Sequence, residues 1–335
     1  MTGRSGNSSP LIKANKDLKA SPRKKKLVAL SHVYGPVPSR RLGYSLGVDI
    51  LPFKTCSFDC IYCQLGRTPR RALRRAKYFA SQGILAQVKK ALASGRKIDH
   101  ITFSGSGEPT LNRDIGTLIR EIKRMTDIPV AVLTNSSMLF RKSVRQALLA
   151  ADLVVSSLDA AAAAAFRKVN RPDPLLRLEN IIEGLEKFRR EFRGQIWLEV
   201  MLVKGINDSP ADLQALKKAV AKIKPDRVQL NTVARPPAEK WARPLSRKEL
   251  DDVRDQLGGR AEVVADFKET SQCPLLENLE DAVLSVVRRR PVNLKDLAEA
   301  LGQDKGAILK ILKGLTDQGR IKRVPHARTF YYESP

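Results

Sequence analysis

Two patterns of hydrophobic and polar residues divide the chain. From residue 44 to about residue 267, short apolar runs rich in Val, Ile and Leu alternate with longer segments of helical spacing. The runs predict buried strands, and the segments between them predict helices. The strands are expected at 45–51, 100–104, 130–134, 153–157, 196–203 and 227–231, and the helices at 84–92, 115–125, 142–150, 175–192 and 211–223. This alternation is typical of an α/β fold with a parallel sheet and helices outside it.

After residue 268 the pattern changes to helices followed by a hairpin. Helices are expected over 277–289, 294–301 and 305–315, and strands over 321–324 and 329–332. This order is typical of a winged helix-turn-helix, whose last helix commonly enters a nucleic-acid groove. The fold also serves protein contacts or dimerisation, and the sequence favours neither use.

The last predicted helix is amphipathic. Its lysines would lie on the exposed side, and its apolar residues would pack inward. The lysines are Lys305, Lys310 and Lys313, and the apolar residues are Ile308, Leu309 and Leu312.

The 335 residues suffice for one large and one small domain. We expect a basic disordered tail over 1–30, a core domain over 31–268 and a winged-helix-like domain over 269–335. The start of the chain lacks an apolar signal segment, and no run is long enough for a membrane span. The cysteines form no regular disulfide framework. We therefore expect a soluble, cytoplasmic protein with no membrane partner.

The net charge of +26 favours a polyanionic partner, with nucleic acid preferred over a merely basic surface. The excess is concentrated in residues 1–26 and in a second run after residue 66 that contains no acid. The second run comprises Arg67, Arg70, Arg71, Arg74, Arg75 and Lys77. We expect it to place positive charge beside the cysteines described next.

Three of the four cysteines, Cys56, Cys60 and Cys63, form the pattern C-x3-C-x2-C. Three thiolates can hold three irons of a cubane [4Fe-4S] cluster and leave the fourth iron open for a small chelating ligand. A structural zinc site wants four ligands, and no Cys or His follows at finger spacing. Unligated thiols would not explain why three cysteines lie so close together. Cys273 is a candidate distal ligand or radical-quenching thiol, but a plain hinge residue is the favoured interpretation.

Polar residues follow the predicted strands at their carboxyl ends. In parallel α/β barrels the chemistry lies at this edge. Single Ser, Asp or Asn residues at such places also cap helices, but five strand ends in a row favour a site. The segments are 104–110, 134–136, 156–159, 204–208 and 229–232.

The cysteine spacing, with the aromatic Tyr62 directly before Cys63, resembles the signature of the radical S-adenosylmethionine (SAM) superfamily. The resemblance implies a partial (β/α)6 TIM-like barrel and a [4Fe-4S] cluster on Cys56, Cys60 and Cys63. It implies that SAM binds the open iron and is reductively cleaved to a 5′-deoxyadenosyl radical. It also implies an external electron donor such as ferredoxin or flavodoxin.

The same resemblance implies the SAM contacts. Residues 105–108 resemble the family's glycine-glycine-glutamate motif, whose backbone and acid bind the methionyl amino group, although Ser106 separates the two glycines here. Glu108 is expected to pair with that ammonium. The full set of expected SAM contacts is Tyr62, Gly105, Gly107, Glu108, Pro109, Thr134, Asn135, Ser157 and Met201. For Met201 an ordinary core position is the alternative, and Glu199 is expected to be an interior polar residue.

Residues 33–235 resemble a group of bacterial and archaeal radical SAM proteins described as Fe-S oxidoreductases, which are related to the wybutosine-synthesising enzymes of tRNA. The wybutosine enzymes carry an additional upstream cysteine set, whereas residues 1–55 here contain no cysteine. Their reaction is therefore not implied. Arg40 and Arg41 precede the first predicted strand, where they could reach a phosphate or carboxylate of the substrate or cap backbone in a Pro-rich loop.

These observations favour a radical SAM enzyme acting on RNA, above all tRNA. A peptide, protein or small metabolite is the alternative substrate, with the winged helix as a docking module. A further alternative is an Fe-S redox sensor that binds nucleic acid. That hypothesis leaves the polar strand ends and Glu108 unexplained.

Overall fold

The computed structural model describes residues 31–39, 41–264, 279–289, 291–326 and 329–335. The predicted tail over 1–30, Arg40 and the hinge with Cys273 lie outside the described residues. The predicted domain boundary near 268 also falls there, so the domain division stays a prediction. Among the helices of the described ranges, none combines the length and the apolar character that a membrane crossing requires.

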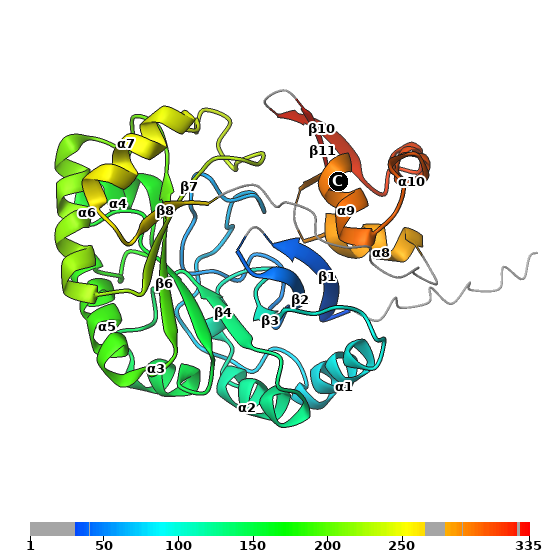
Figure 1. Ribbon diagram of the computed structural model, residues 1–335, viewed down its shortest axis with the longest axis horizontal. Coiled ribbons are helices and arrows are strands. Elements are labelled where there is room, and N and C mark those ends of the chain that lie inside the picture. Colours follow the sequence, from blue (N-terminus) through cyan, green and yellow to red (C-terminus); the bar gives the residue numbers. More distant parts are fainter. Residues whose placement is uncertain (1–30, 40, 265–278, 290, 327–328) are drawn as a thin grey trace, which may run out of the picture. The chain divides into compact units, whose positions relative to one another are not determined.

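The core is one sheet of eight strands in the order β1 to β8 (Figure 1). Strands β2 to β8 are parallel, and β1 pairs with β2 in the antiparallel sense. Within the described residues β1 and β8 are not neighbours, so the sheet is an open partial barrel. The strands are β1 (Val33–Ser39), β2 (Gly43–Val48), β3 (His100–Phe103), β4 (Val130–Thr134), β5 (Leu153–Ser157), β6 (Gln195–Leu202), β7 (Arg227–Thr232) and β8 (Ala261–Val263).

Helices connect the parallel strands and cover the outer face of the curved sheet (Figure 1). The predicted α/β class is confirmed, and each of the six predicted strands and five predicted helices overlaps an observed one. The strands β1 and β8 and the helices α4 and α7 were not predicted. The helices are α1 (Ser81–Leu92), α2 (Ile115–Met125), α3 (Lys142–Leu148), α4 (Ala163–Asn170), α5 (Leu178–Glu191), α6 (Pro210–Ile223) and α7 (Arg247–Leu257).

The side chains of each strand alternate between two cores. In β5, Val154 packs in the large outer core under the helices, whereas Val155 packs in a small inner cluster with Leu42, Ala131 and Trp197. This inner cluster fills only one level of the barrel. The carboxyl ends of the strands are therefore left to polar residues.

Strand β1 lies where the sequence analysis expected a Pro-rich loop, so that interpretation was wrong. Prolines are tolerated on an edge strand because its outer N–H groups need no sheet partner. The register shifts between Tyr34 and Val37, around the cis peptide bond before Pro36. Val37 packs into the core of the C-terminal unit, defined here as the described residues from 279 onward.

The C-terminal unit has three helices and a three-stranded antiparallel sheet in the order β10-β11-β9. The predicted order of helices and hairpin is observed, with β9 in addition. That the unit works as a winged helix-turn-helix stays a prediction. Its elements are α8 (Leu279–Val287), β9 (Val292–Asn293), α9 (Leu294–Leu301), α10 (Lys305–Asp317), β10 (Lys322–His326) and β11 (Thr329–Glu333).

Helix α10 corrects one prediction. Ile308 and Leu312 are fully buried, as expected, but Leu309 is 48% exposed. The inward stripe continues through Leu315, because residues spaced by three or four positions share one face of a helix. Leu309 falls beside that stripe.

Candidate functional site

A cavity of about 330 Å³ opens at the carboxyl ends of the parallel strands. The cysteine loop after β2 and the turn after β3 form one side of it. The ends of β5, β6 and β7 form the other. Seven of the predicted site residues line it, namely Cys56, Tyr62, Cys63, Gly105, Gly107, Ser157 and Met201.

The three cysteines are unpaired, and each sulfur is within reach of one nitrogen donor. Donors of this kind stabilise a thiolate and tune the metal that it binds. The sequence analysis missed two of these three donors and gave Asn135 a different role. The contacts are Lys54 Nζ to Cys63 Sγ at 3.1 Å, Asn135 Nδ2 to Cys56 Sγ at 3.5 Å and Asn170 Nδ2 to Cys60 Sγ at 3.4 Å.

Burial dominates the acid–base properties of Cys56 and Cys60. It raises the pKa of Cys56 to about 12 and that of Cys60 well above the ordinary value. The carboxylate of Glu108 and the thiol of Cys63 raise the pKa of Cys56 further. Without a metal the two groups are protonated, and a metal must displace their protons to bind.

The donor set fits an iron–sulfur cluster better than a single ion. Within the described ranges, no three Cys, His, Asp or Glu side chains converge on a point where one metal ion could sit. In a cubane cluster each thiolate binds its own iron, so the three sulfurs need not converge. The three thiols with their nitrogen donors therefore suit the cluster and not zinc.

The turn after β3 requires both of its glycines. Gly105 has φ +139°, and a Cβ there would lie 2.5 Å from Cγ of Asp49. A Cβ on Gly107 would lie 1.9 Å from the carbonyl oxygen of Thr55. The missing side chains let the turn pack closely against Asp49 and Thr55, and both glycines line the cavity. This is the geometry needed to bind a polar ligand through main-chain groups.

Glu108 follows the turn and is 2% exposed. Its carboxylate accepts hydrogen bonds from Thr110 N at 3.0 Å, Thr110 Oγ1 at 2.5 Å, Thr134 Oγ1 at 2.7 Å and Asn135 N at 2.6 Å. Burial raises its pKa, and these donors lower it in part. The expected pairing with an ammonium ligand stays a prediction. The carboxylate ties the turn after β3 to the end of β4.

A second buried carboxylate, Asp159, was missed as a site residue. It accepts hydrogen bonds from Tyr62 Oη and Asn170 Nδ2, both at 2.5 Å, and from Met201 N at 2.9 Å. Burial raises its pKa to about 6. Its position two residues after β5 was the available signal. Asp159 fixes the ring of Tyr62 in the cysteine loop and, through Asn170, the donor to Cys60.

The opposite wall carries charged side chains that face the cavity. Arg41 Nη1 lies 2.6 Å from Glu199 Oε2, and Asn231 Nδ2 donates to Glu199 Oε1 at 3.1 Å. Arg235 donates to Gln64 at 3.0 Å. The expected interior position of Glu199 is confirmed. Arg41 pairs with this carboxylate and does not cap a loop.

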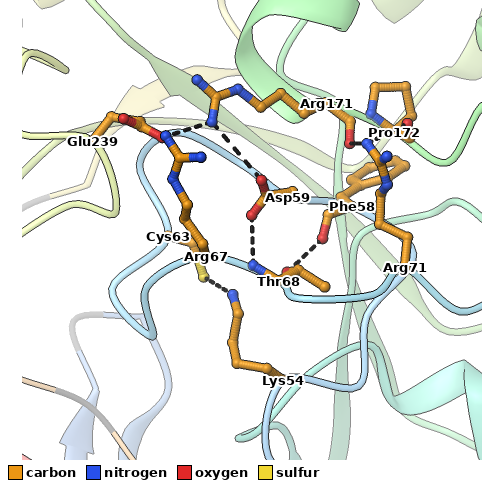
Figure 2. A network of polar contacts seen from close by, with 10 residues as sticks. All are labelled: Lys54, Phe58, Asp59, Cys63, Arg67, Thr68, Arg71, Arg171, Pro172 and Glu239. Atoms are coloured by element: carbon orange, nitrogen blue, oxygen red, sulfur yellow. Dashed lines mark hydrogen bonds and ion pairs between the residues drawn. The ribbon is translucent and has the colours of Figure 1, made fainter.

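Two arginines of the basic run after residue 66, Arg67 and Arg71, make contacts around the cysteine loop (Figure 2). Arg67 pairs with Glu239 at 2.6 Å, and the same carboxylate pairs with Arg171 at 2.6 Å. Arg71 donates to the carbonyl oxygens of Arg171 and Pro172. Part of this positive charge is paired within the fold, and the expectation that the run places positive charge beside the cysteines stays a prediction.

Residues 50–216 match the radical SAM superfamily. The chain is 31% identical to "UPF0026 protein MJ1312" of Methanocaldococcus jannaschii, over 89% of this chain and 94% of that protein. It is 35% identical to a "UPF0026 protein" of Helicobacter pylori strain J99, over 79% of this chain and 86% of that protein. It is also 39% identical to a "GTPase Obg" of Brachyspira hyodysenteriae over 87% of this chain, but spans only 43% of that protein.

Among solved structures, the fold is similar to a radical SAM methyltransferase from Sphaerobacter thermophilus. The TM-score is 0.49 and the identity 20%, over 65% of each chain. The relationship at the sequence level covers most of this chain and nearly the whole of the archaeal relative. The chain therefore belongs to the UPF0026 proteins and, with them, to the radical SAM superfamily of iron–sulfur enzymes.

Proposed function

We propose that the chain holds a [4Fe-4S] cluster on Cys56, Cys60 and Cys63 and binds SAM in the adjoining cavity. The observation that carries this proposal is a cavity lined by Cys56, Cys63, Gly105 and Gly107, beside a loop in which all three thiols have a nitrogen donor. When bound, the cluster supplies the electron, received from an external donor such as ferredoxin or flavodoxin, that cleaves SAM reductively to a 5′-deoxyadenosyl radical.

The residues of the chain bind and orient the reactants. Lys54, Asn135 and Asn170 offset the negative charge of the three thiolates. The turn at 105–107 offers main-chain groups to the methionyl end of SAM. Ser157 and Met201 face it from the opposite wall. Such fixed positioning reduces the entropy that the reaction must lose before bond cleavage.

The test is anaerobic reconstitution with iron and sulfide, followed by addition of SAM and dithionite. We expect the wild type to bind iron and release 5′-deoxyadenosine. Cys60→Ala should lose both properties, whereas Cys273→Ala should keep them, because Cys273 is not part of the three-cysteine motif. Equal release by Cys60→Ala and wild type, or a fully loaded wild type that neither binds nor cleaves SAM, would contradict the proposal.

The substrate that we propose is RNA, above all tRNA. The net charge of +26 supports a polyanionic partner. The exposed lysines of α10, Lys305, Lys310 and Lys313, support contact with phosphates on the C-terminal unit. A peptide or small metabolite would not require such a helix.

This substrate proposal predicts salt-dependent RNA binding through α10. Changing the three α10 lysines to Gln should weaken tRNA binding and flatten its dependence on log salt by roughly 2 units, from about 0.7 per lost phosphate contact. The matched control changes the exposed lysines of α6, Lys217, Lys218 and Lys222, to Gln. Equal weakening in both variants, or no RNA binding by wild type, would instead favour a peptide or small-metabolite substrate.

A further inference from the structure

The C-terminal unit reaches the barrel through Arg289, which lies two residues after the end of α8. The side chain of Arg289 is 12% exposed, and its Nη1 donates to the carbonyl oxygen of Ser285 at 2.7 Å. Its Nε lies 3.7 Å from Oδ2 of Asp49, and its guanidinium lies 4.5 Å from the centre of the Tyr34 ring. Arg289 is thus bonded to its own unit and contacts Asp49 and Tyr34 of the barrel, and its Nη2 also donates to the carbonyl oxygen of Ser31.

Asp49 and Tyr34 are each bonded to the turn after β3. Oδ2 of Asp49 accepts a hydrogen bond from Ser106 Oγ at 2.5 Å. The hydroxyls of Tyr34 and Ser104 are 3.0 Å apart. Two chains of contacts therefore connect Arg289 to the turn. One passes through the carboxylate of Asp49 to Ser106, and the other through the phenol of Tyr34 to Ser104. They reach the turn on either side of Gly105.

These contacts leave the turn little freedom. Asp49 is 7% exposed and lies directly under Gly105, and Ser106 is 9% exposed. A buried hydrogen bond to a charged group has no water to replace it when it breaks. The position of the turn therefore depends on where Asp49 lies, and the charge of Asp49 is balanced by Arg289.

The packing of the C-terminal unit supports the same connection. Val37 of β1 lies in one apolar core with Val283, Val287 and Leu297 of that unit, and Tyr34 packs against this core. A displacement of α8 would thus shift β1 and Arg289 together. The charged and the apolar contacts transmit the same movement.

We infer that Arg289, Asp49 and Ser106 are positioning residues, through which the C-terminal unit sets the turn at 104–108 and hence the affinity for SAM. This inference rests on the proposed function for the identity of the ligand. It also explains why serine stands between the two glycines. A glycine at position 106 would have no hydroxyl to donate to Asp49.

The first test is SAM binding by the full-length, cluster-loaded protein. Arg289→Met and Ser106→Ala should each weaken SAM binding roughly tenfold, because each removes a buried contact to a charged carboxylate. Ser106→Thr keeps the hydroxyl and should bind nearly as the wild type does. Arg288→Met, on the exposed neighbour of Arg289, is the matched control. The double variant Arg289→Met/Ser106→Ala should be less than additive, because both changes break one chain of contacts.

The second test needs no SAM. Amide hydrogen exchange over 104–112 should be faster in Arg289→Met and Ser106→Ala than in wild type, and unchanged in Arg288→Met. Exchange over β6 should stay the same, because a merely destabilised fold would open there as well. Iron content should match that of the wild type.

The outcomes separate the two proposals. If wild type binds and cleaves SAM while all variants match it in affinity and exchange, the inference is overturned and the proposed function stands. If wild type does not bind SAM, the proposed function fails. The inferred control of SAM affinity then fails with it, and exchange over 104–112 shows whether the mechanical connection from α8 to the turn exists.

Discussion

The two walls of the cavity use their charged groups in opposite ways. Behind the wall formed by the cysteine loop and the turn after β3, Glu108 and Asp159 are 2% and 3% exposed and accept hydrogen bonds from donors of the protein. On the opposite wall, Arg41 and Glu199 have side chains that are 16% and 15% exposed and line the cavity as a pair. The carboxylates of the first wall are bonded within the protein, whereas the charged groups of the second wall would face a ligand in the cavity.

The difference follows from the cost of burying charge. A buried carboxylate is tolerated only when donors surround it, and such a network then fixes the elements that supply the donors. This suits a wall that holds the same cofactor in every turnover. A partly exposed ion pair can exchange a partner for a ligand at lower cost, which suits the wall that would meet the substrate.

The largest effect is expected from Glu108→Ala. It leaves four donors from Thr110, Thr134 and Asn135 without a partner, and should lower the free energy of unfolding by about 4 kcal/mol. Glu108→Gln keeps one acceptor oxygen and should lose less. Urea denaturation measures both. A loss below that of the Arg41 variant described below would contradict the picture of a wall whose carboxylates are bonded within the protein.

The second-largest loss of stability is expected from Asp159→Ala. It removes the acceptor of Tyr62, Asn170 and Met201 and should destabilise the fold by about 3 kcal/mol. Because Asn170 also donates to Cys60, the loaded variant should lose its cluster faster, as followed by the loss of visible absorbance. Asp159→Asn is the isosteric comparison. An unchanged rate of cluster loss would mean that Asp159 does not support the cysteine loop.

Arg41→Met should have a smaller effect on stability. The variant breaks the pair with Glu199, but Asn231 still donates to that carboxylate and the site is partly hydrated, so about 1.5 kcal/mol is expected. Thermal and urea unfolding measure it beside the two buried carboxylates. A loss as large as that of Glu108→Ala would show that the second wall is as rigid as the first.

The smallest loss of stability is expected at a helix cap that lies outside both walls, and it serves as a reference for the other variants. Ser209 caps α6 by accepting a hydrogen bond from Asp212 N at 3.2 Å. Ser209→Ala should cost about 0.5–1 kcal/mol, and iron content and SAM binding should not change. An effect on SAM binding would mean that stability by itself alters the site, and the other variants would have to be corrected for it.

The apolar pattern by itself determined most of the barrel, because buried parallel strands are continuous runs of Val, Ile and Leu. The six central strands and the helices between them follow from it. The cysteine spacing and the glycine turn indicated the cofactor site, since both are local features. Strand β1 was not predicted, because Pro36 and Pro38 suggested a loop although prolines are tolerated on an edge strand. Helix α4 was not predicted, because the alanines from 160 to 165 show no periodic pattern of polar and apolar residues.

Only the tertiary structure decided what each polar residue does. Glu108 lies in a motif that suggests a ligand contact, yet Thr134 and Asn135 of the next strand end surround it. Asp159 gained its role from Tyr62, and Asp49 from Arg289, each far away in the sequence. The physical reason is that a side chain's charge is set by its neighbours in space. Strand order and the docking of the C-terminal unit choose those neighbours, and no local pattern encodes them.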